Sequence, residues 1–353
     1  MVADKRLGEL LDFVVAQGGS DLHIFAGGPP MLRVSGALIP MSKHPAFTAE
    51  ETAEMLKSIV PPERFESFEK AQSVDLSYAH KESVRFRVNG YQVKGAAALA
   101  FRLIPRAIST FTELNLPPIL DVFTQREQGF FLVVGPVGQG KSTTLATMID
   151  RINDSRAEHI LTIEDPVEYL FTQKRSLIHQ REVHVDTPDF HTALQSAFRE
   201  DVDVIMVGEM RDYETISSAV TAAETGHLVF STLHTNNAAQ TIDRIIDMFP
   251  AEQQDQVRVQ LAGSLAGIFS QRLIPRVSGG LIPAYELLIN NNAVGTLIRE
   301  ARTHEINTVI QTSSQEGMID MDRSLAELVR RGEVTVEHAY EYSMDPKTFE
   351  HYL

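Results

Sequence analysis

Residues 135–142 read GPVGQGKS, and the residues on either side limit what this stretch can fold into. The apolar run 130–134 before it suits a buried strand, and residues 143–149 after it continue helically. The glycines let the loop curl with its amide N–H groups pointing inward, Lys141 supplies a positive charge, and Ser142 offers a hydroxyl to Mg²⁺. The sequence therefore predicts a strand, a phosphate-binding loop and a helix whose N-terminus faces the phosphates.

Length and charge narrow the class of protein. The chain has 353 residues, which favours two domains over a single core. Its 32 Lys and Arg against 47 Asp and Glu give a net charge of −15, which disfavours nucleic acid as a partner. No apolar run is long enough to span a bilayer, so we expect neither a membrane helix nor a signal peptide. The absence of cysteine excludes disulfides and thiolate zinc sites and fits a cytoplasmic protein.

The first hundred residues predict a small α+β domain. Apolar residues between Leu7 and Val15 recur at helical spacing, a second helix is expected over 49–59, and strands are expected within 74–103. Within those strands, Arg85 and Arg87 alternate with apolar residues. The two arginines are therefore expected on the face opposite the core, where a partner could be met.

The domains follow from changes in pattern along the chain. We expect the first domain at residues 1–103, a linker at 104–118 that carries three prolines, and the second domain at 119–353. In the second domain, helical segments alternate with apolar runs that suit buried strands, which predicts a parallel sheet covered by helices. These runs are FFLVV (130–134), ILTI (160–163), VIMV (204–207) and HLVFSTL (227–233).

The last hundred residues are expected to be mainly helical. After Pro250, the spacing predicts a helix with one apolar face, and a largely helical tail is expected after Pro283. The residues on that apolar face are Val257, Leu261, Leu265 and Ile268.

Polar residues follow three of the predicted strands. Glu164 follows the second run, Glu209 follows the third after Gly208, and His234 follows the fourth. Parallel strands present their carboxyl ends at one edge of the sheet, where a carboxylate can hold Mg²⁺ or orient water and a histidine can sense the γ-phosphate. Helix-capping roles for the two acids and a core role for His234 are the structural alternatives.

Several blocks of sequence then resemble one family. The chain is similar to the secretion-superfamily hexameric ATPases, and over nearly its whole length to their pilus-retraction branch, the type IV pilus retraction ATPases. The segments TIEDPVEY (162–169), REDVDVIMVGEMRD (199–212) and AAETGHLVFSTLHTNNAAQTIDRIIDMFP (222–250) look like the aspartate box, atypical Walker B and histidine box of that superfamily. RFRVNGY (85–91) and AFRLIP (100–105) extend the resemblance toward the N-terminus.

The resemblance implies an α/β fold in which a RecA-like P-loop NTPase domain follows a smaller N-terminal α+β domain of PAS-like type. It also implies ATP and Mg²⁺ as ligands, with roles for particular residues. Nucleotide binding falls to Gly135, Pro136, Val137, Gly138, Gln139, Gly140, Lys141, Ser142, Thr143 and His227; metal binding to Ser142, Glu164 and Glu209; and catalysis to Glu209, Glu164, Arg87, Arg102 and His234. For the two arginines, a solvated strand face is the alternative.

The same resemblance implies partners and a function. It implies a homohexamer on the cytoplasmic side of the inner membrane, docked without insertion on a pilus platform protein, with a second retraction ATPase as a further partner. ATP hydrolysis would drive removal of pilin from the pilus and so twitching motility. The alternatives are a pilus assembly or type II secretion ATPase, an accessory retraction homologue, and a nucleotide-dependent scaffold that does not hydrolyse ATP.

Departures from the family pattern bear on the direction of the motor. Val137 and Gln139 stand where the family usually has Thr and Ser, which removes no phosphate ligand. The segment AVGTLIRE (293–300) resembles the family's AIRNLIRE but has Gly295 and Thr296 in place of Arg and Asn. In the family that segment is tied to retraction, so the sequence predicts hydrolysis more firmly than it predicts retraction.

Overall fold

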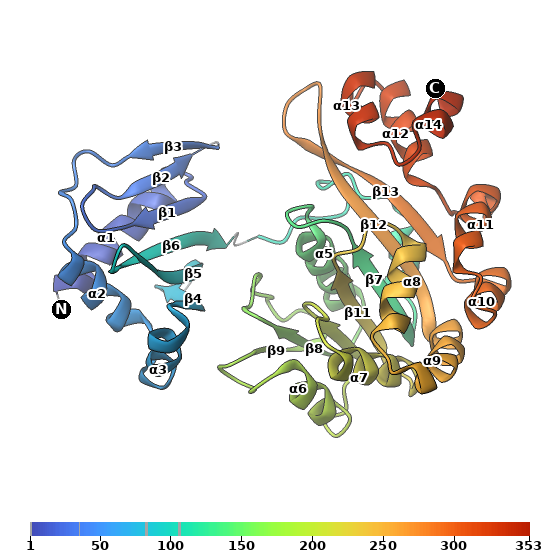
Figure 1. The fold of residues 1–353 in the computed structure, drawn as a ribbon, viewed down its shortest axis with the longest axis horizontal. Coiled ribbons are helices and arrows are strands. Elements are labelled where there is room, and N and C mark those ends of the chain that lie inside the picture. The colour runs from blue at the N-terminus through green and yellow to red at the C-terminus, as the bar shows by residue number, and fades with distance from the viewer. Residues whose placement is uncertain (1, 35, 82–83, 105–106) are drawn as a thin grey trace. The chain divides into compact units, whose positions relative to one another are not determined.

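The computed structural model describes residues 2–34, 36–81, 84–104 and 107–353. The chain divides into two compact units, one formed by residues 1–107 with 166–170 and the other by residues 108–165 with 171–353 (Figure 1). Within the described ranges, no helix combines the length and the apolarity that a bilayer crossing requires.

The first unit is built on a six-stranded antiparallel sheet in the order β3-β2-β1-β6-β5-β4. One face of the sheet packs on the helices, with Phe86 and Val88 fully buried there, whereas Arg85 and Arg87 point away and are half-buried. The predicted face of these arginines is confirmed. The elements of this unit are α1 (Val2–Ala16), β1 (Asp21–Ile24), β2 (Met31–Val34), β3 (Ala37–Pro40), α2 (Ala49–Ile59), α3 (Pro62–Ala71), β4 (Ser73–His80), β5 (Val84–Val93) and β6 (Ala96–Ile104).

The second unit contains a seven-stranded sheet in the order β13-β12-β7-β11-β10-β8-β9. All neighbours in this sheet run parallel except β13, which is antiparallel to β12. Up to β11 its elements are α4 (Leu120–Thr124), β7 (Gly129–Val134), α5 (Lys141–Ser155), β8 (His159–Glu164), β9 (Leu177–Glu182), α6 (Phe190–Ala197), β10 (Val204–Val207), α7 (Tyr213–Glu224) and β11 (Leu228–Leu233). The elements after β11 are α8 (Ala238–Asp247), α9 (Ala251–Ser264), β12 (Leu265–Pro275), β13 (Leu281–Ile289), α10 (Asn292–Arg299), η1 (Thr303–Glu305), α11 (Ile306–Thr312), η2 (Ser314–Glu316), α12 (Met321–Arg330), α13 (Val336–Tyr342) and α14 (Pro346–Tyr352).

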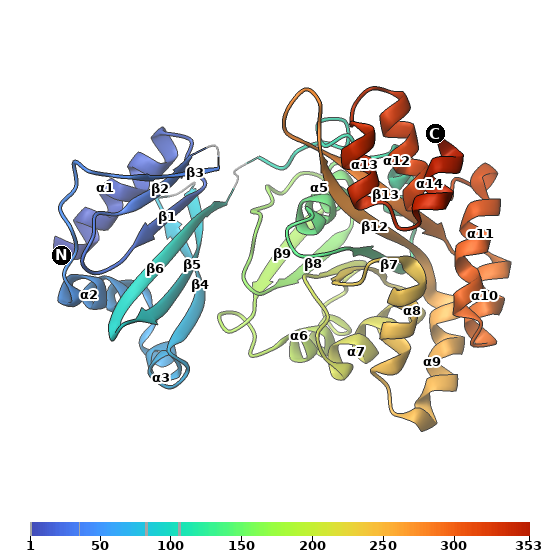
Figure 2. The same ribbon diagram turned by 45° about the horizontal axis from the view of Figure 1, so that its top comes forward.

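Helices cover both faces of this sheet (Figure 2). Phe131 and Val133 of β7 pack with α4 and α5 on one face, whereas Phe130, Leu132 and Val134 pack with α6 to α9 on the other. All six residues of β7 are therefore buried. The C-terminal helices α12, α13 and α14 form a separate apolar cluster with the far ends of β12 and β13.

The predicted helix after Pro250 is correct only in its first part. Helix α9 ends at Ser264, and Leu265 and Ile268 lie on β12, so their assignment to the helix is wrong. Both side chains are nevertheless buried in the same apolar cluster as Val257 and Leu261. A short buried apolar run has the same pattern in a helix and in an interior strand, which is why the spacing misled the prediction.

The helical tail also begins later than expected. Pro283 lies inside β13, where it is opposite Leu273 of β12, and the helices start only at Asn292. Strand β13 is at the edge of the sheet. An edge strand tolerates proline because the missing N–H is not needed by a further neighbour.

One core residue of β13 is a carboxylic acid. Glu286 is 6% exposed, and burial raises its pKa to about 7, with Asp320 and Asp322 acting in the same direction. Burial disfavours the charged form, so the folded protein holds the proton to a higher pH than the unfolded chain does.

We expect Glu286→Gln to gain stability relative to the wild type as the pH rises. Between the unfolded value of 4.5 and the folded value of about 7, the folded wild type binds more protons, so its stability falls through that window. The full difference in free energy of unfolding is about 3 kcal/mol. Urea unfolding from pH 5 to pH 8 measures it, with the exposed Glu214→Gln as control; a difference that does not change with pH would contradict the expectation.

Candidate functional site

Four neighbouring strands bring the predicted site residues of the second unit, except His227, to one end of the sheet. Strands β7, β11, β10 and β8 are consecutive and parallel, so their carboxyl ends lie side by side. The phosphate-binding loop follows β7, His234 follows β11, Glu209 follows β10, and Glu164 ends β8. The predicted common edge is therefore present in the structure.

The phosphate-binding loop has the backbone that its glycines were expected to provide. Gly138 and Gly140 have φ angles of 78° and 76°, and Gly135 has 144°. A Cβ on Gly135 would lie 2.4 Å from the carbonyl oxygen of Gln271 on β12, so that position has no room for a side chain. Pro136, Val137 and Gln139 complete the loop, and Ser142 and Thr143 lie in the first turn of α5.

Lys141 is buried, and its ammonium group points back over the loop. The Nζ atom donates to the carbonyl oxygens of Gly135 at 2.8 Å and Pro136 at 2.9 Å. It also lies 3.1 Å from Nδ1 of His234. Since Nε2 of His234 is 3.6 Å from a carboxylate oxygen of Glu209, the histidine lies between the lysine and the acid. We call Lys141, His234 and Glu209 the charge chain.

The position of Glu209 depends on the glycine before it. Gly208 donates its backbone N–H to Ile163 on β8, and a Cβ there would lie 3.3 Å from that residue's carbonyl oxygen and 3.8 Å from Cγ of Glu164. A side chain at this position would press on the carbonyl oxygen of Ile163, and the first carboxylate after β10 is that of Glu209. Glu209 also pairs with Arg211, and its side chain is 18% exposed.

Glu164 is held by its neighbours on β8 and β9. Its Oε1 accepts hydrogen bonds from Thr162 Oγ1 at 2.7 Å and from Gln180 Nε2 at 3.2 Å. The hydroxyl of Ser142 and the carboxylates of Glu164 and Glu209 are hard oxygen donors of the kind that Mg²⁺ prefers, together with phosphate oxygens. The donor set at this edge therefore fits Mg²⁺.

His227 lies apart from the residues of the charge chain. It directly precedes β11, and its carbonyl accepts the N–H of Gly129 at the start of β7. Because seven residue steps separate His227 from His234 along β11 and a strand rises about 3.3 Å per residue, the two lie roughly 23 Å apart. Within one chain, His227 lies at the amino end of β11, whereas the phosphate-binding loop lies at the carboxyl ends of the parallel strands.

Arg87 and Arg102 lie together in the first unit. They are opposite each other on β5 and β6, and so share one face of the sheet. Arg102 donates to Asp21 at 2.8 Å, and Arg87 is 3.2 Å from Glu168. Burial of Asp21 opposes its ionisation, but hydrogen bonds from Arg102 and Ser20 outweigh that effect and lower the pKa of Asp21. The Arg102 side chain is still 72% exposed, and its action on a nucleotide stays a prediction.

Sequence reasoning missed Gln271, which supports the phosphate-binding loop from β12. Its Nε2 donates to the carbonyl oxygen of Gln139 at 2.7 Å, and its Oε1 accepts from Thr144 Oγ1 at 2.7 Å. In return, the Gln139 side chain accepts the N–H of Leu273 at 2.6 Å. The signal that could have found this contact is the polar triplet Ser270, Gln271 and Arg272, which interrupts the apolar run 265–275.

The fold and the site together define a RecA-like P-loop ATPase. The chain belongs to the Type II/IV secretion system protein family, which it matches over residues 14–283. It is 44% identical over 341 residues to the Type IV pilus retractation ATPase PilT of Pseudomonas aeruginosa, with 97% of this chain and 99% of that protein covered. The identity is 47% over 311 residues with a Twitching motility protein of Neisseria gonorrhoeae, covering 88% and 83%.

A solved structure gives the same result for the fold. The pilus retraction motor PilT with bound ADP is 44% identical, with a TM-score of 0.90 and 98% of each chain covered. The predicted family and fold class are confirmed.

We expect Gln271→Ala to weaken nucleotide binding. The substitution removes two hydrogen bonds that hold the loop and α5, each worth about 1 kcal/mol, so the Kd for ATP should rise about tenfold to thirtyfold. Titration with a fluorescent ATP analogue measures the change. Gln254→Ala is the matched control, because it removes a glutamine of α9 that donates to the carbonyl oxygen of Phe249. Equal affinities for the two variants would count against the support role.

Proposed function

We propose that this protein is a hexameric motor that hydrolyses ATP to retract a type IV pilus, and so drives twitching motility. The observation that carries hydrolysis is the charge chain of Lys141, His234 and Glu209 at the end of the phosphate-binding loop. The 44% sequence identity with PilT, which extends over nearly the whole length of both proteins, supports pilus retraction as the work that hydrolysis drives.

Each residue of the edge has a role in the proposed reaction. Lys141 turns from the loop carbonyls to the β- and γ-phosphates, and His234 contacts the γ-phosphate. Glu209 accepts the proton of the attacking water as the water oxygen bonds to phosphorus and the bond to the ADP oxygen breaks. Ser142 and Glu164 would hold Mg²⁺, which neutralises charge on the phosphates when bound.

The two arginines of the first unit complete the proposed site. We propose that Arg87 and Arg102 stabilise the negative charge that develops on the phosphates, as arginine fingers do in other ATPases. Asp21 must then give up Arg102 to the nucleotide, and the high exposure of that arginine supports such an exchange. Completion of the site by these arginines would link hydrolysis to movement between domains. His227, at the amino end of β11, is proposed to act across a subunit boundary of the hexamer.

The partners and location belong to the same proposal. The motor would act as a homohexamer at the cytoplasmic face of the inner membrane, bound to a pilus platform protein without entering the bilayer. A second retraction ATPase is a further proposed partner, and nucleic acid is not, given the net charge of −15.

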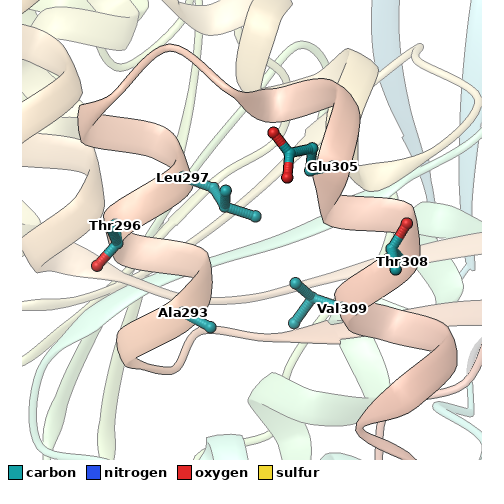
Figure 3. Close-up of a pocket in the computed structure, with 6 residues that line it drawn as sticks. All are labelled: Ala293, Thr296, Leu297, Glu305, Thr308 and Val309. Atoms are coloured by element: carbon teal, nitrogen blue, oxygen red, sulfur yellow. The ribbon is translucent and has the colours of Figure 1, made fainter.

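The sequence and surroundings of helix α10 favour a second candidate function. An open groove of about 380 Å³ is lined by Ala293, Thr296 and Leu297 of α10 and by Glu305, Thr308 and Val309 (Figure 3). Gly295 is buried, and a Cβ there would lie 3.5 Å from the carbonyl oxygen of Ala262 on α9. The segment departs from the family's AIRNLIRE at Gly295 and Thr296, and this departure favours an accessory retraction ATPase as the alternative to the main motor.

We expect Glu209→Gln to lower kcat for ATP hydrolysis by about a thousandfold, because general bases contribute that order of acceleration. Lys141→Ala should remove both nucleotide binding and turnover. Phosphate release by the assembled protein with Mg²⁺ measures both effects, and Glu214→Gln on the exposed side of α7 is the control. Normal turnover by Glu209→Gln would exclude it as the base, and an assembled wild type without turnover would leave the scaffold alternative.

Deleting the gene in its native host tests the direction of the motor. Retraction predicts that surface pili persist or accumulate while twitching is lost, since pilin is no longer removed from the pilus base. Electron microscopy and a surface motility assay measure the two outcomes, with restoration of the gene as control. Loss of all pili would indicate an assembly ATPase, and retained twitching would indicate an accessory role.

A further inference from the structure

Glu286 on β13 lies in the same row of paired residues as the carboxyl ends of the strands that carry the proposed catalytic residues. It is opposite Ser270 of β12, which is opposite Val134 of β7, which is opposite Leu233 of β11. Val134 and Leu233 directly precede the phosphate-binding loop and His234. A buried carboxylate therefore occupies the same row as the strand ends that carry the charge chain.

The carboxylate of Glu286 contacts the helix that follows His234. Its Oε1 accepts the N–H of Ala238, the first residue of α8, at 2.7 Å, and Ser270 Oγ is 3.4 Å away. Only three residues separate His234 from Ala238. The hydroxyls of Thr235 and Thr241 are 2.6 Å apart, which also holds this short segment against α8. Residues 234–237 thus connect the end of β11 to the start of α8, and Glu286 holds that start of the helix in place.

We propose that Glu286 is a positioning residue for ATP hydrolysis: by holding Ala238 it fixes the segment that presents His234 to Lys141 and Glu209. The inference rests on the role of His234 stated under Proposed function. Among the described residues, the hydrogen bonds of Glu286 go to Ala238 and Ser270 and to no residue of the charge chain. Its effect should therefore fall on kcat, through the geometry of His234, and leave the KM for ATP nearly unchanged.

Ionisation of Glu286 should strengthen this contact. A carboxylate accepts an amide hydrogen bond more strongly than a carboxylic acid does, and it lies at the positive end of α8. Among the described residues, the charges that act on it are those of Asp320, which caps α12, and Asp322 in the first turn of α12, and both oppose its ionisation. Since burial raises the pKa of Glu286 to about 7, the contact should become stronger as the pH rises through neutrality.

A double-mutant cycle separates this inference from the proposed role of His234. At pH 8, we expect Glu286→Ala to lower kcat about tenfold in the wild type but less than twofold in His234→Ala, because the positioned residue is then absent. A tenfold loss in both backgrounds would overturn the positioning role. If His234→Ala leaves kcat unchanged, the proposed role of His234 fails and this inference fails with it.

Glu286→Gln covers the case in which the alanine variant does not fold. Glutamine keeps the size and the acceptor but does not ionise, so we expect its kcat to match the wild type at pH 6 and to be about threefold lower at pH 8.5. Thr303→Val is the matched control, because Thr303 binds Asp243 farther along α8. Its ratio to the wild type should not change with pH. Parallel pH profiles for Glu286→Gln and the wild type would overturn the inference.

Discussion

The burial of β7 on both faces is the constraint on which the rest of the second unit depends. Its six residues are all buried because α4 and α5 cover one side of the sheet and α6 to α9 the other. A strand held in this way ends at a fixed point, and the chain must leave through Gly135, where only a glycine clears the carbonyl oxygen of Gln271. The phosphate-binding loop, α5 and the neighbouring strand ends all take their positions from that exit.

Two polar residues, one on β12 and one on β13, then support two different parts of the site at the carboxyl ends of the parallel strands. Gln271 supports the loop and α5, whereas Glu286 supports the start of α8. Glu286 reduces stability when it ionises in the core, since burial opposes its charge. A core residue that costs stability at neutral pH while it holds the segment of His234 is a trade of stability for function.

The sequence was informative wherever a local pattern had one structural solution. The run before Gly135 could only be a buried strand once GKS followed it, and the alternation around Arg87 could only place that arginine on the outer face. Leu265 and Ile268 were misassigned because a buried apolar run suits a helix and a strand equally well. The helical tail was expected directly after Pro283, whereas β13 continues past it, because nothing local says that a strand lies at the edge of its sheet and so tolerates proline.

The sequence by itself determined the nucleotide chemistry of this protein, because the loop, its lysine and its serine are contiguous and their backbone needs are local. It also determined which strand ends carry acids and a histidine. Only the tertiary structure decided that Gln139 bonds to β12 and that Glu286 holds α8. These contacts depend on strand order and register, which bring together residues far apart in the chain: 48 positions for Ala238 and Glu286, and 132 for Gln139 and Gln271.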